Sequence, residues 1–193
     1  MSPQKNSPML SNHFQQPSPR PVNAFCEIRF SKIHGRGVFT SRNLRLGSKI
    51  IEYRGELIDK EESNRRGNEL FETSQHTGGA SVYIFDLDET HDLDGDKEWN
   101  PARLINHTCE PNAEMIDEDG RLYLYALSDI RKGEEISFDY GYDIEHFLDH
   151  TCRCGKPSCV GYIVSQAQWL KLAKRLKNKK RAKLPASKFD TAH

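Results

Sequence analysis

Apolar residues along this chain fall mostly in short runs separated by glycine-rich or polar turns. Runs of this kind that are rich in Val, Ile, Phe and Tyr predict β-strands. We expect strands over residues 25–30, 38–40, 49–58, 82–87, 113–116, 121–127 and 135–140. Many short strands with little helix predict a mainly β domain, a β-rich α+β fold, rather than a doubly wound parallel sheet.

Three segments carry helix signals. Asp59 followed by Glu62 predicts a capped helix that runs to about residue 72. Pro101 favours the first turn of a short helix over residues 102–105. From residue 164 to about residue 180, apolar residues recur at roughly helical spacing, which predicts a carboxy-terminal helix. Turns are expected at residues 34–37, 78–79, 117–120 and 132–133.

The composition indicates one folded domain with polar ends. The chain has 193 residues, 36% of them hydrophobic, and a mean hydropathy of −0.76, which indicates a moderate core. Residues 1–22 hold five of the nine prolines and are expected to form a disordered leader. The sequence has neither an apolar stretch of membrane-spanning length nor the apolar core of a signal peptide. We therefore expect an intracellular protein in a reducing compartment.

The formal net charge of +0 hides a separation of charge along the chain. Residues 171–183 hold eight Lys or Arg and no acid, and the remainder has 20 basic against 28 acidic residues, or about −8. The acidic run over residues 86–98 is either a solvated loop or a feature that attracts a basic peptide. The basic segment is a solvated helix face, a nuclear-localisation signal or a weak contact for nucleic acid.

The cysteines point to a metal site. Three of the five lie within eight residues, too close for ordinary disulfide pairing and typical of metal ligation: Cys152, Cys154 and Cys159. Structural zinc takes four ligands in a tetrahedron, with thiolate sulfur about 2.3 Å from the metal. The triplet supplies three of them, and Cys109, Cys26 or His150 can supply the fourth. We expect a structural zinc that performs no chemistry itself.

Two further motifs precede the cysteine triplet. They are Asn106-His107-Thr108-Cys109-Glu110-Pro111-Asn112 and Phe138-Asp139-Tyr140-Gly141. In this order, and followed by the triplet, they resemble the SET-domain family of protein-lysine methyltransferases, in the branch that carries a cysteine-rich post-SET segment. The resemblance covers about residues 25–163. It implies a SET-domain fold of short strands and small sheets, in which residues 106–112 thread under a neighbouring loop as a pseudoknot.

The resemblance also implies how the chain is organised. A SET domain is expected over residues 23–143, a post-SET zinc segment over residues 144–163, and a carboxy-terminal helix with a basic tail over residues 164–193. In the family, the cysteine of the first motif completes the zinc site, so the implied fourth ligand is Cys109. The metal would then fasten the chain after Tyr140 as a wall over the reaction centre. Zinc loss is therefore expected to weaken cofactor and substrate binding.

S-adenosylmethionine is the cofactor that the resemblance implies. The turn Gly35-Arg36-Gly37 matches the family's Gly-x-Gly element, whose backbone lies against the methionine part of the cofactor, and glycine permits that approach. By itself the turn would be a simple hairpin. Asn106 and His107 are implied contacts beside the adenine and amino-acid portions. Tyr83 is expected to help enclose the cofactor, whereas Arg103 is equally well a structural residue.

Three aromatic residues are implied at the reaction centre. Methyl transfer to an amine is an in-line displacement, so the enzyme mainly aligns atoms and excludes water, and an apolar channel favours the neutral amine. Tyr140 holds the family's catalytic position, where its hydroxyl orients the amine. Tyr53 matches a second tyrosine of the lysine channel. In the family, a tyrosine at the position of Phe138 holds a water and favours transfer of a single methyl group. The phenylalanine of this chain therefore implies an enzyme able to add two or three methyl groups.

The resemblance thus implies methylation of lysine in a protein substrate, with a histone-like basic tail as one candidate. The alternative is a catalytically silent SET module that binds chromatin or nucleic acid through residues 171–183. The presence of Tyr140, Asn106, His107 and Phe138 argues against it, because a silent module does not need them. No membrane partner is expected.

Overall fold

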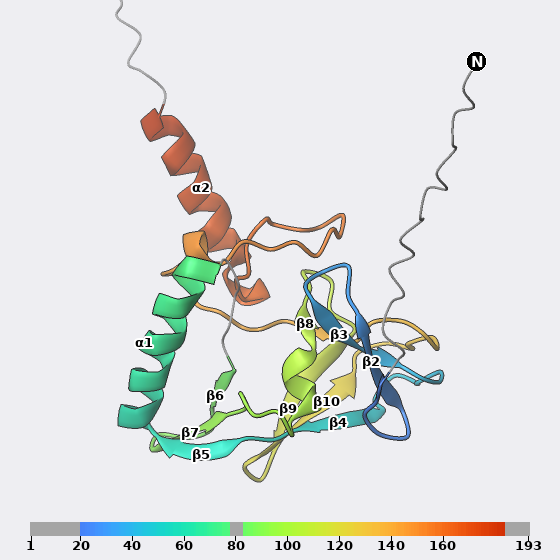
Figure 1. Ribbon diagram of the computed structural model, residues 1–193. Coiled ribbons are helices and arrows are strands. Elements are labelled where there is room, and N and C mark those ends of the chain that lie inside the picture. The colour runs from blue at the N-terminus through green and yellow to red at the C-terminus, as the bar shows by residue number, and fades with distance from the viewer. Residues whose placement is uncertain (1–19, 78–82, 184–193) are drawn as a thin grey trace, which may run out of the picture.

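A computed structural model of the protein describes residues 20–77 and 83–183. Its body consists of four small sheets (Figure 1). The first joins β1 (Arg20–Pro21), β2 (Cys26–Phe30) and β3 (Arg36–Thr40) in that order. The second has the order β4 (Lys49–Tyr53), β10 (Arg121–Ala126), β9 (Ala113–Glu118). The third has the order β5 (Glu56–Asp59), β7 (His91–Asp94), β6 (Ile84–Asp86), and the fourth pairs β11 (Ser137–Phe138) with β8 (Asn106–His107).

Helices are few in the described ranges. The two α-helices are α1 (Lys60–Thr77) and α2 (Trp169–Lys183), and the 3-10 turns are η1 (Pro101–Leu104), η2 (Phe147–Asp149) and η3 (Gln166–Gln168). In Figure 1, α1 stands beside the sheets and α2 projects away from them. This strand-rich arrangement with a carboxy-terminal helix confirms the predicted fold class. Neither α-helix has the apolar character that crossing a bilayer requires.

Local signals in the sequence account for several boundaries. The carboxylate of Asp59 accepts a hydrogen bond from the Glu62 amide at 2.8 Å, so Asp59 caps α1 as predicted. The side chain of Glu62 pairs with Arg65 and Arg66 one turn along the helix. Between β9 and β10, Asp119 and Gly120 both have positive φ, 54° and 79°, which suits a two-residue hairpin turn.

Other predicted elements differ in length from those observed. The helix expected to end near residue 72 continues to Thr77, and the one expected from residue 164 begins at Trp169, after η3. The strand expected over residues 49–58 is divided between two sheets at Gly55, where a Cβ would collide with the backbone of Asp94. In the region expected to form a strand over residues 135–140, only β11 is regular.

The expected leader and the loop after α1 lie partly outside the described residues. Arg20 and Pro21, the last part of the expected 1–22 leader, pair with Ile28 and Glu27 of β2, so a strand begins inside that segment. Residues 1–19, the turn at residues 78–79 and the start of the strand expected at residue 82 lie outside the described residues.

The acidic run over residues 86–98 is largely built into the structure. Its centre forms β7, in which Asp92 and Asp94 are buried. Asp92 pairs with Lys60 of α1 at 2.5 Å, and Asp94 with Arg66 at 2.5 Å. The expectation of a solvated loop is wrong for this part of the run, because sheet pairing and two cations from α1 hold the carboxylates.

Two apolar clusters hold the fold together. The larger one lies among the sheets and includes Leu124, Ile136 and Ile105, each at most 1% exposed. The smaller one consists of Ile144, Phe147, Val164 and Leu172, and it packs the segment after β11 against α2. The carboxy-terminal segment therefore has a small core of its own beside the main one.

Candidate functional site

The two polar motifs meet in the parallel strand pair β8 and β11. Asn106 lies opposite Ser137, and His107 lies opposite Phe138. The side chain of Asn112 fastens the chain beyond β8: its amide nitrogen donates to the Glu135 carbonyl at 2.9 Å, and its oxygen accepts from the Ser137 amide at 2.9 Å. Segments 31 residues apart along the chain are thereby held side by side.

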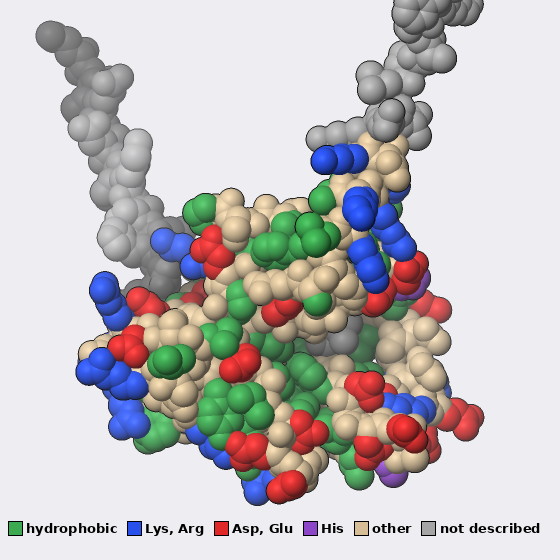
Figure 2. Space-filling model, turned by 180° about the vertical axis from the view of Figure 1, so that it is seen from behind, with side chains coloured by type: hydrophobic (Ala, Val, Ile, Leu, Met, Phe, Trp, Pro, Cys, Tyr) green, Lys and Arg blue, Asp and Glu red, His purple; other side chains and the backbone are tan. Residues whose placement is uncertain are grey.

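A cavity of about 560 Å³ opens next to this strand pair. Its volume is within the range of sites that enclose a small molecule, about 300–1,000 Å³. Figure 2 shows the molecule hollowed on the face below the projecting α2, with hydrophobic side chains around the hollow. The cavity brings together residues from five separate parts of the chain: His34, Gly35, Arg36, Tyr53, Tyr83, Ile84, Phe85, Asp86, Ala102, Arg103, Leu104, Ile105, Asn106, Phe138, Tyr140, Gly141 and Tyr142.

The glycine turn forms one wall of the cavity and is held by Asn106. The amide nitrogen of Asn106 donates to the Arg36 carbonyl at 3.1 Å and to a carboxylate oxygen of Glu135 at 2.7 Å. A Cβ on Gly37 would collide with that carboxylate, so a larger residue there would displace Glu135 from Asn106. Gly35 has a φ of +47°, which also favours glycine. The turn is therefore fixed by contacts and is more than a simple hairpin.

Tyr140 lies at the centre of the aromatic part of the site. Its hydroxyl donates to the Ile105 carbonyl at 2.9 Å, and its backbone amide donates to Nδ1 of His107 at 3.3 Å. Its ring centroid lies 5.0 Å from that of Phe138 and 5.6 Å from that of Tyr142. Burial raises the pKa of the Tyr140 hydroxyl well above its usual value, so the group is neutral at neutral pH.

His107 has the environment of a neutral imidazole. Burial lowers the pKa of its side chain, although Asp139, 3.7 Å from Nδ1, opposes that effect. Because Nδ1 accepts the Tyr140 amide, the ring proton belongs on Nε2, which lies 3.9 Å from Sγ of Cys109. His107 thus links the aromatic site to the cysteines without lining the large cavity; it lines a smaller one of about 60 Å³ together with Cys152 and Asn106.

Tyr53 closes the cavity from the opposite side. Its hydroxyl donates to the Tyr83 carbonyl at 2.9 Å, and its ring meets that of Phe85 edge-on at 4.6 Å. The backbone of Gly95 lies against the Tyr53 ring so closely that a Cβ at this position would overlap it. Asn100, fully buried, donates to the Gly95 carbonyl at 2.9 Å and holds that backbone in place. The position of Tyr53 therefore depends on a glycine 42 residues away.

The two arginines differ in how they are held. Arg103 pairs with Asp96 at 3.0 Å and lies with its guanidinium 6.0 Å from the centroid of the Tyr83 ring. Arg36 is exposed at the mouth of the cavity. Arg103 therefore forms a structural ion pair and also lines the cavity. Its environment is compatible both with a structural role and with contact to a cofactor.

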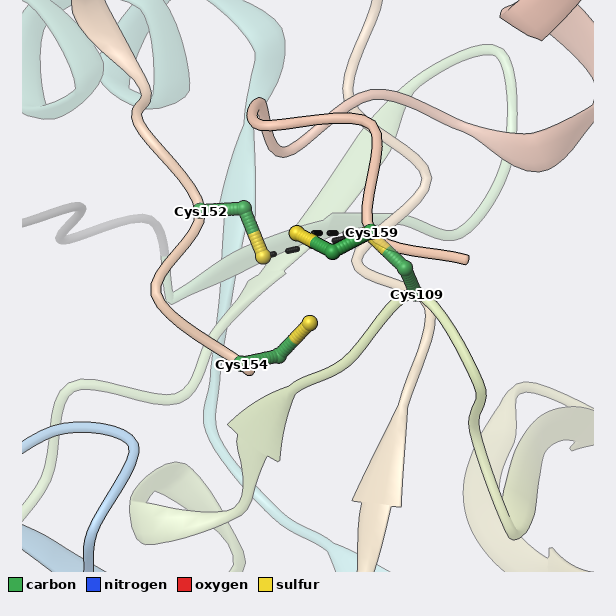
Figure 3. A group of neighbouring side chains, drawn as sticks. All are labelled: Cys109, Cys152, Cys154 and Cys159. Atoms are coloured by element: carbon green, nitrogen blue, oxygen red, sulfur yellow. Dashed lines mark hydrogen bonds between the residues drawn. The ribbon is translucent and has the colours of Figure 1, made fainter. Parts of the chain in front are cut away.

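The four motif cysteines come together beside β8 (Figure 3). All four Sγ atoms lie within 4.8 Å of one another, and Sγ of Cys109 is 3.8 Å from those of Cys152 and Cys159. A tetrahedron of sulfurs about 2.3 Å from zinc has edges of about 3.8 Å, so the spacing fits that metal. Of the alternative fourth ligands, Cys26 is buried in the main core and His150 packs on Tyr142.

The cysteine cluster is tied to the rest of the site by neighbouring side chains. Gln166 donates from its side chain to the Cys109 carbonyl at 3.0 Å and from its backbone to Asp139 at 2.9 Å. Glu110 accepts hydrogen bonds from the amide and hydroxyl of Ser158, at 3.0 and 2.8 Å. Burial raises the pKa of the Cys109 thiol to about 12, and a cation would be needed to make it a thiolate at neutral pH.

Sequence reasoning missed three residues that support the site. Glu135 accepts hydrogen bonds from Asn106 and, at 2.7 Å, from the Ser31 hydroxyl, and Gly95 and Gln166 fix Tyr53 and Cys109. Glu135 is 104 residues from Ser31 along the chain, and no local pattern marks it. The one available signal for Glu135 was its place at the start of the strand expected over residues 135–140; Gly95 and Gln166 had none.

Comparison with known proteins agrees with this geometry. The family model described as SET domain matches residues 35–141. Histone-lysine N-methyltransferase trr of Drosophila melanogaster is 38% identical over 136 residues, covering 67% of this chain and 5% of that protein. "Histone-lysine N-methyltransferase, H3 lysine-4 specific" of Aspergillus oryzae is 35% identical over 144 residues, 70% of this chain and 11% of that protein.

A human protein extends the comparison to another lysine. "Histone-lysine N-methyltransferase, H3 lysine-36 specific" of Homo sapiens is 33% identical over 150 residues, 76% of this chain and 5% of that protein. The chain thus spans only a small part of the length of each of these relatives. With the family match covering more than half of its residues, the chain belongs to the SET domain family.

Proposed function

We propose that the protein is a protein-lysine N-methyltransferase that uses S-adenosylmethionine as its methyl donor. One observation carries this proposal: a glycine turn fixed by Asn106 and an aromatic group around the Tyr140 hydroxyl share one cavity of about 560 Å³. The names of the relatives support the same reaction class, since each is a histone-lysine N-methyltransferase. The chain spans a small part of those proteins, so the activity is proposed for this segment on its own residues.

The residues fit the proposed cofactor. Gly35 leaves the backbone of the turn open to a ligand, whereas Gly37 is buried against Glu135 and does not line the cavity. Asn106 holds the turn so that little ordering is needed on binding. Tyr83 and Arg103 line the same cavity and are proposed to enclose the bound molecule. When bound, S-adenosylmethionine supplies an electrophilic methyl group. The protein aligns the acceptor amine with it and keeps water out.

The proposed role of Tyr140 follows from its hydrogen bond. Because its hydroxyl proton is engaged by the Ile105 carbonyl at 2.9 Å, the lone pairs of the phenol oxygen remain available to accept an N–H of the substrate amine. The amine lone pair then points away from the phenol, towards the methyl group. A lysine has a pKa near about 10.4 in water, and the aromatic walls of Phe85, Phe138 and Tyr53 favour its neutral, nucleophilic form.

We propose that Cys109, Cys152, Cys154 and Cys159 hold a structural zinc. Four thiolates fill its coordination sphere, so it binds no substrate and polarises no bond. Its function is to join the segment after β11 to residue 109, next to His107. Residues 151–153 and Ile163 then stay in place as one side of the smaller cavity near Asn106.

The substrate is proposed to be a basic protein tail of the histone kind. Two of the relatives are named for lysines of histone H3, and without residues 171–183 the chain carries a charge of about −8. An acidic body attracts a cationic peptide and speeds its encounter with the site.

The test is to incubate the protein with isotopically labelled S-adenosylmethionine and a panel of histones and other basic proteins. Label on lysine, mapped by mass spectrometry, is the expected result. The competing function, a silent module, predicts that chromatin or nucleic acid is bound while no lysine gains label. Absence of label from every protein tried, with cofactor binding intact, would therefore favour the silent module.

Phe138→Tyr is expected to shift the product towards fewer methyl groups without abolishing activity. The Phe138 ring lies 5.0 Å from that of Tyr140 and carries no hydroxyl that could hold a water beside the target nitrogen. The wild type should therefore reach di- or trimethyl-lysine when S-adenosylmethionine is in excess. Mass spectra of a lysine peptide over time measure the products of both proteins, and a wild type that stops at one methyl contradicts this role of Phe138.

A further inference from the structure

Helix α2 touches the rest of the protein along one narrow stripe. Leu172 is buried and Leu176 half-buried against Ile144 and Phe147, and Trp169 donates from its indole to the Val164 carbonyl at 3.1 Å. The remaining described side chains of the helix from Leu170 to Lys179 are exposed. The apolar stripe of α2 is thus already used by the protein itself, and apart from Leu170, which is 81% exposed, and Ala173, its described exposed side chains are polar.

The exposed surface of α2 is strongly cationic. Of its 15 residues eight are Lys or Arg and none is acidic. Among the described side chains of the helix, Arg175 is the one that forms an ion pair, with Glu145 at 2.8 Å, and Lys179 lies over the Phe147 ring. Figure 2 shows Lys and Arg side chains gathered along this projecting part of the molecule.

Three lysines form a stripe along α2 at intervals of three residues: Lys171, Lys174 and Lys177. Residues three apart on a helix are neighbours, and each like-charged pair at such spacing costs about 0.2–0.5 kcal/mol. One acid of the body lies near the start of the stripe, because the charge of Lys171 helps to lower the pKa of the Asp143 carboxyl. Among the described residues, Lys174 and Lys177 form no ion pair. The positive charge of the stripe is therefore only partly compensated by the described residues, and a polyanion would compensate the rest.

We propose that α2 docks in the major groove of duplex DNA and contacts the phosphates on either side of it, independently of base sequence. A helix of 15 residues is about 22 Å long, and the major groove of B-DNA, about 12 Å wide, admits such a helix. The narrow major groove of duplex RNA does not. Single strands are bound by stacking on aromatic side chains, and the exposed residues 170–179 include no aromatic one.

An anionic membrane is the less suitable partner for the same helix. Amphipathic helices bind bilayers by burying their apolar face in the lipid. In α2 that face is occupied by Ile144, Phe147 and Val164. The body of the protein is acidic, and the phosphates of DNA would repel it. Contact with DNA is therefore expected only through the helix that projects from the body.

The test compares wild type with a variant that carries Lys171→Gln, Lys174→Gln and Lys177→Gln. Glutamine keeps the helix propensity of lysine and removes its charge. Binding of a mixed-sequence 30-base-pair duplex is measured by fluorescence anisotropy at several salt concentrations. Loss of three phosphate contacts should lower the slope of log K against log salt by about 2.7, at about 0.9 per contact. Affinity at low salt should fall at least about tenfold.

Matched variants separate charge on α2 from charge in general. Lys32→Gln, Arg131→Gln and Lys132→Gln remove three exposed cations from the body and should leave affinity and slope as in wild type. Lys171→Arg, Lys174→Arg and Lys177→Arg keep the charge and should retain binding. Circular dichroism establishes that all variants hold the same helix content.

Several outcomes would overturn the proposal. One is that the glutamine variant and its body control bind DNA equally well, and another is that the arginine variant loses affinity. The proposal also fails if single strands or duplex RNA bind more tightly than duplex DNA, or if phosphatidylserine vesicles are bound in preference to it. Methylation of a short free peptide should be the same in wild type and in the glutamine variant. If DNA is not bound, the proposed enzymatic function is unaffected. If no lysine is methylated, the proposed DNA contact is likewise unaffected.

Discussion

Tyr140→Phe is expected to slow methyl transfer by about 10²–10³-fold, the usual loss when one positioned hydrogen-bonding group is removed from an active site. The ring remains and keeps its packing on Phe138 and His107, at centroid distances of 5.0 and 5.4 Å. The amine loses the oxygen that orients it, whereas the Asn106 contacts to the glycine turn are untouched. Affinity for S-adenosylmethionine should therefore change little. Calorimetric titration measures that affinity, and peptide methylation measures the rate.

Tyr125→Phe is the matched control for this experiment. Tyr125 lies in β10, does not line the cavity, and its hydroxyl is hydrogen-bonded to Glu118. Its replacement removes one phenol oxygen and one hydrogen bond, worth about 0.5–1.5 kcal/mol of stability, without affecting the site. If Tyr140→Phe turns over like this control, the orienting role assigned to Tyr140 is wrong.

Cys109→Ser is expected to remove zinc from the protein and to weaken both methyl transfer and cofactor binding. A hydroxyl is a poor replacement for a thiolate, and loss of a direct ligand should cost more than the 10–100-fold in metal affinity typical of outer-shell changes. In the proposed site, the metal would join Cys109 to residues 43 and 50 positions later. Without it, the segment that carries Cys152 and Arg153 should separate from Asn106. Metal content per chain and cofactor affinity are the two measurements.

The fifth cysteine provides the control for the metal experiment. Cys26 is 1% exposed in the main core, and burial raises the pKa of its thiol to about 12. Cys26→Ser should lower stability, because it buries a hydroxyl among apolar groups, yet keep one zinc per chain. Full zinc retention in Cys109→Ser would exclude residue 109 as a ligand and leave a three-cysteine site.

The sequence predicted best those features whose signals are local. The hairpin turn at residues 117–120, the cap at Asp59 and the strand over residues 25–30 each depend on a few consecutive side chains. The motif residues could also be found, since their spacing and order are recognisable without coordinates. The four sulfurs within 4.8 Å of one another are compatible with the zinc site that the family resemblance implied, whereas the roles of the other motif residues stay predictions.

The features that could not be predicted depend on contacts between distant segments. The burial of Asp92 and Asp94 requires Lys60 and Arg66 on α1. The residues of the acidic run do not by themselves show that these two cations lie next to it. The division of the strand at Gly55 reflects the backbone of Asp94 lying against it. In each case, tertiary packing determined the outcome where local propensity allowed several.

The order of the four cysteines along the chain has a consequence for biosynthesis. Cys109 leaves the ribosome 43 residues before Cys152, which at 5–20 residues per second is about 2–9 s earlier. During that time it is a single thiol beside a strand pair that cannot form until β11 has been made. We expect metal capture to be the closing step of maturation, so zinc-starved cells should accumulate chains that are folded around the sheets and still open to proteases between residues 144 and 163.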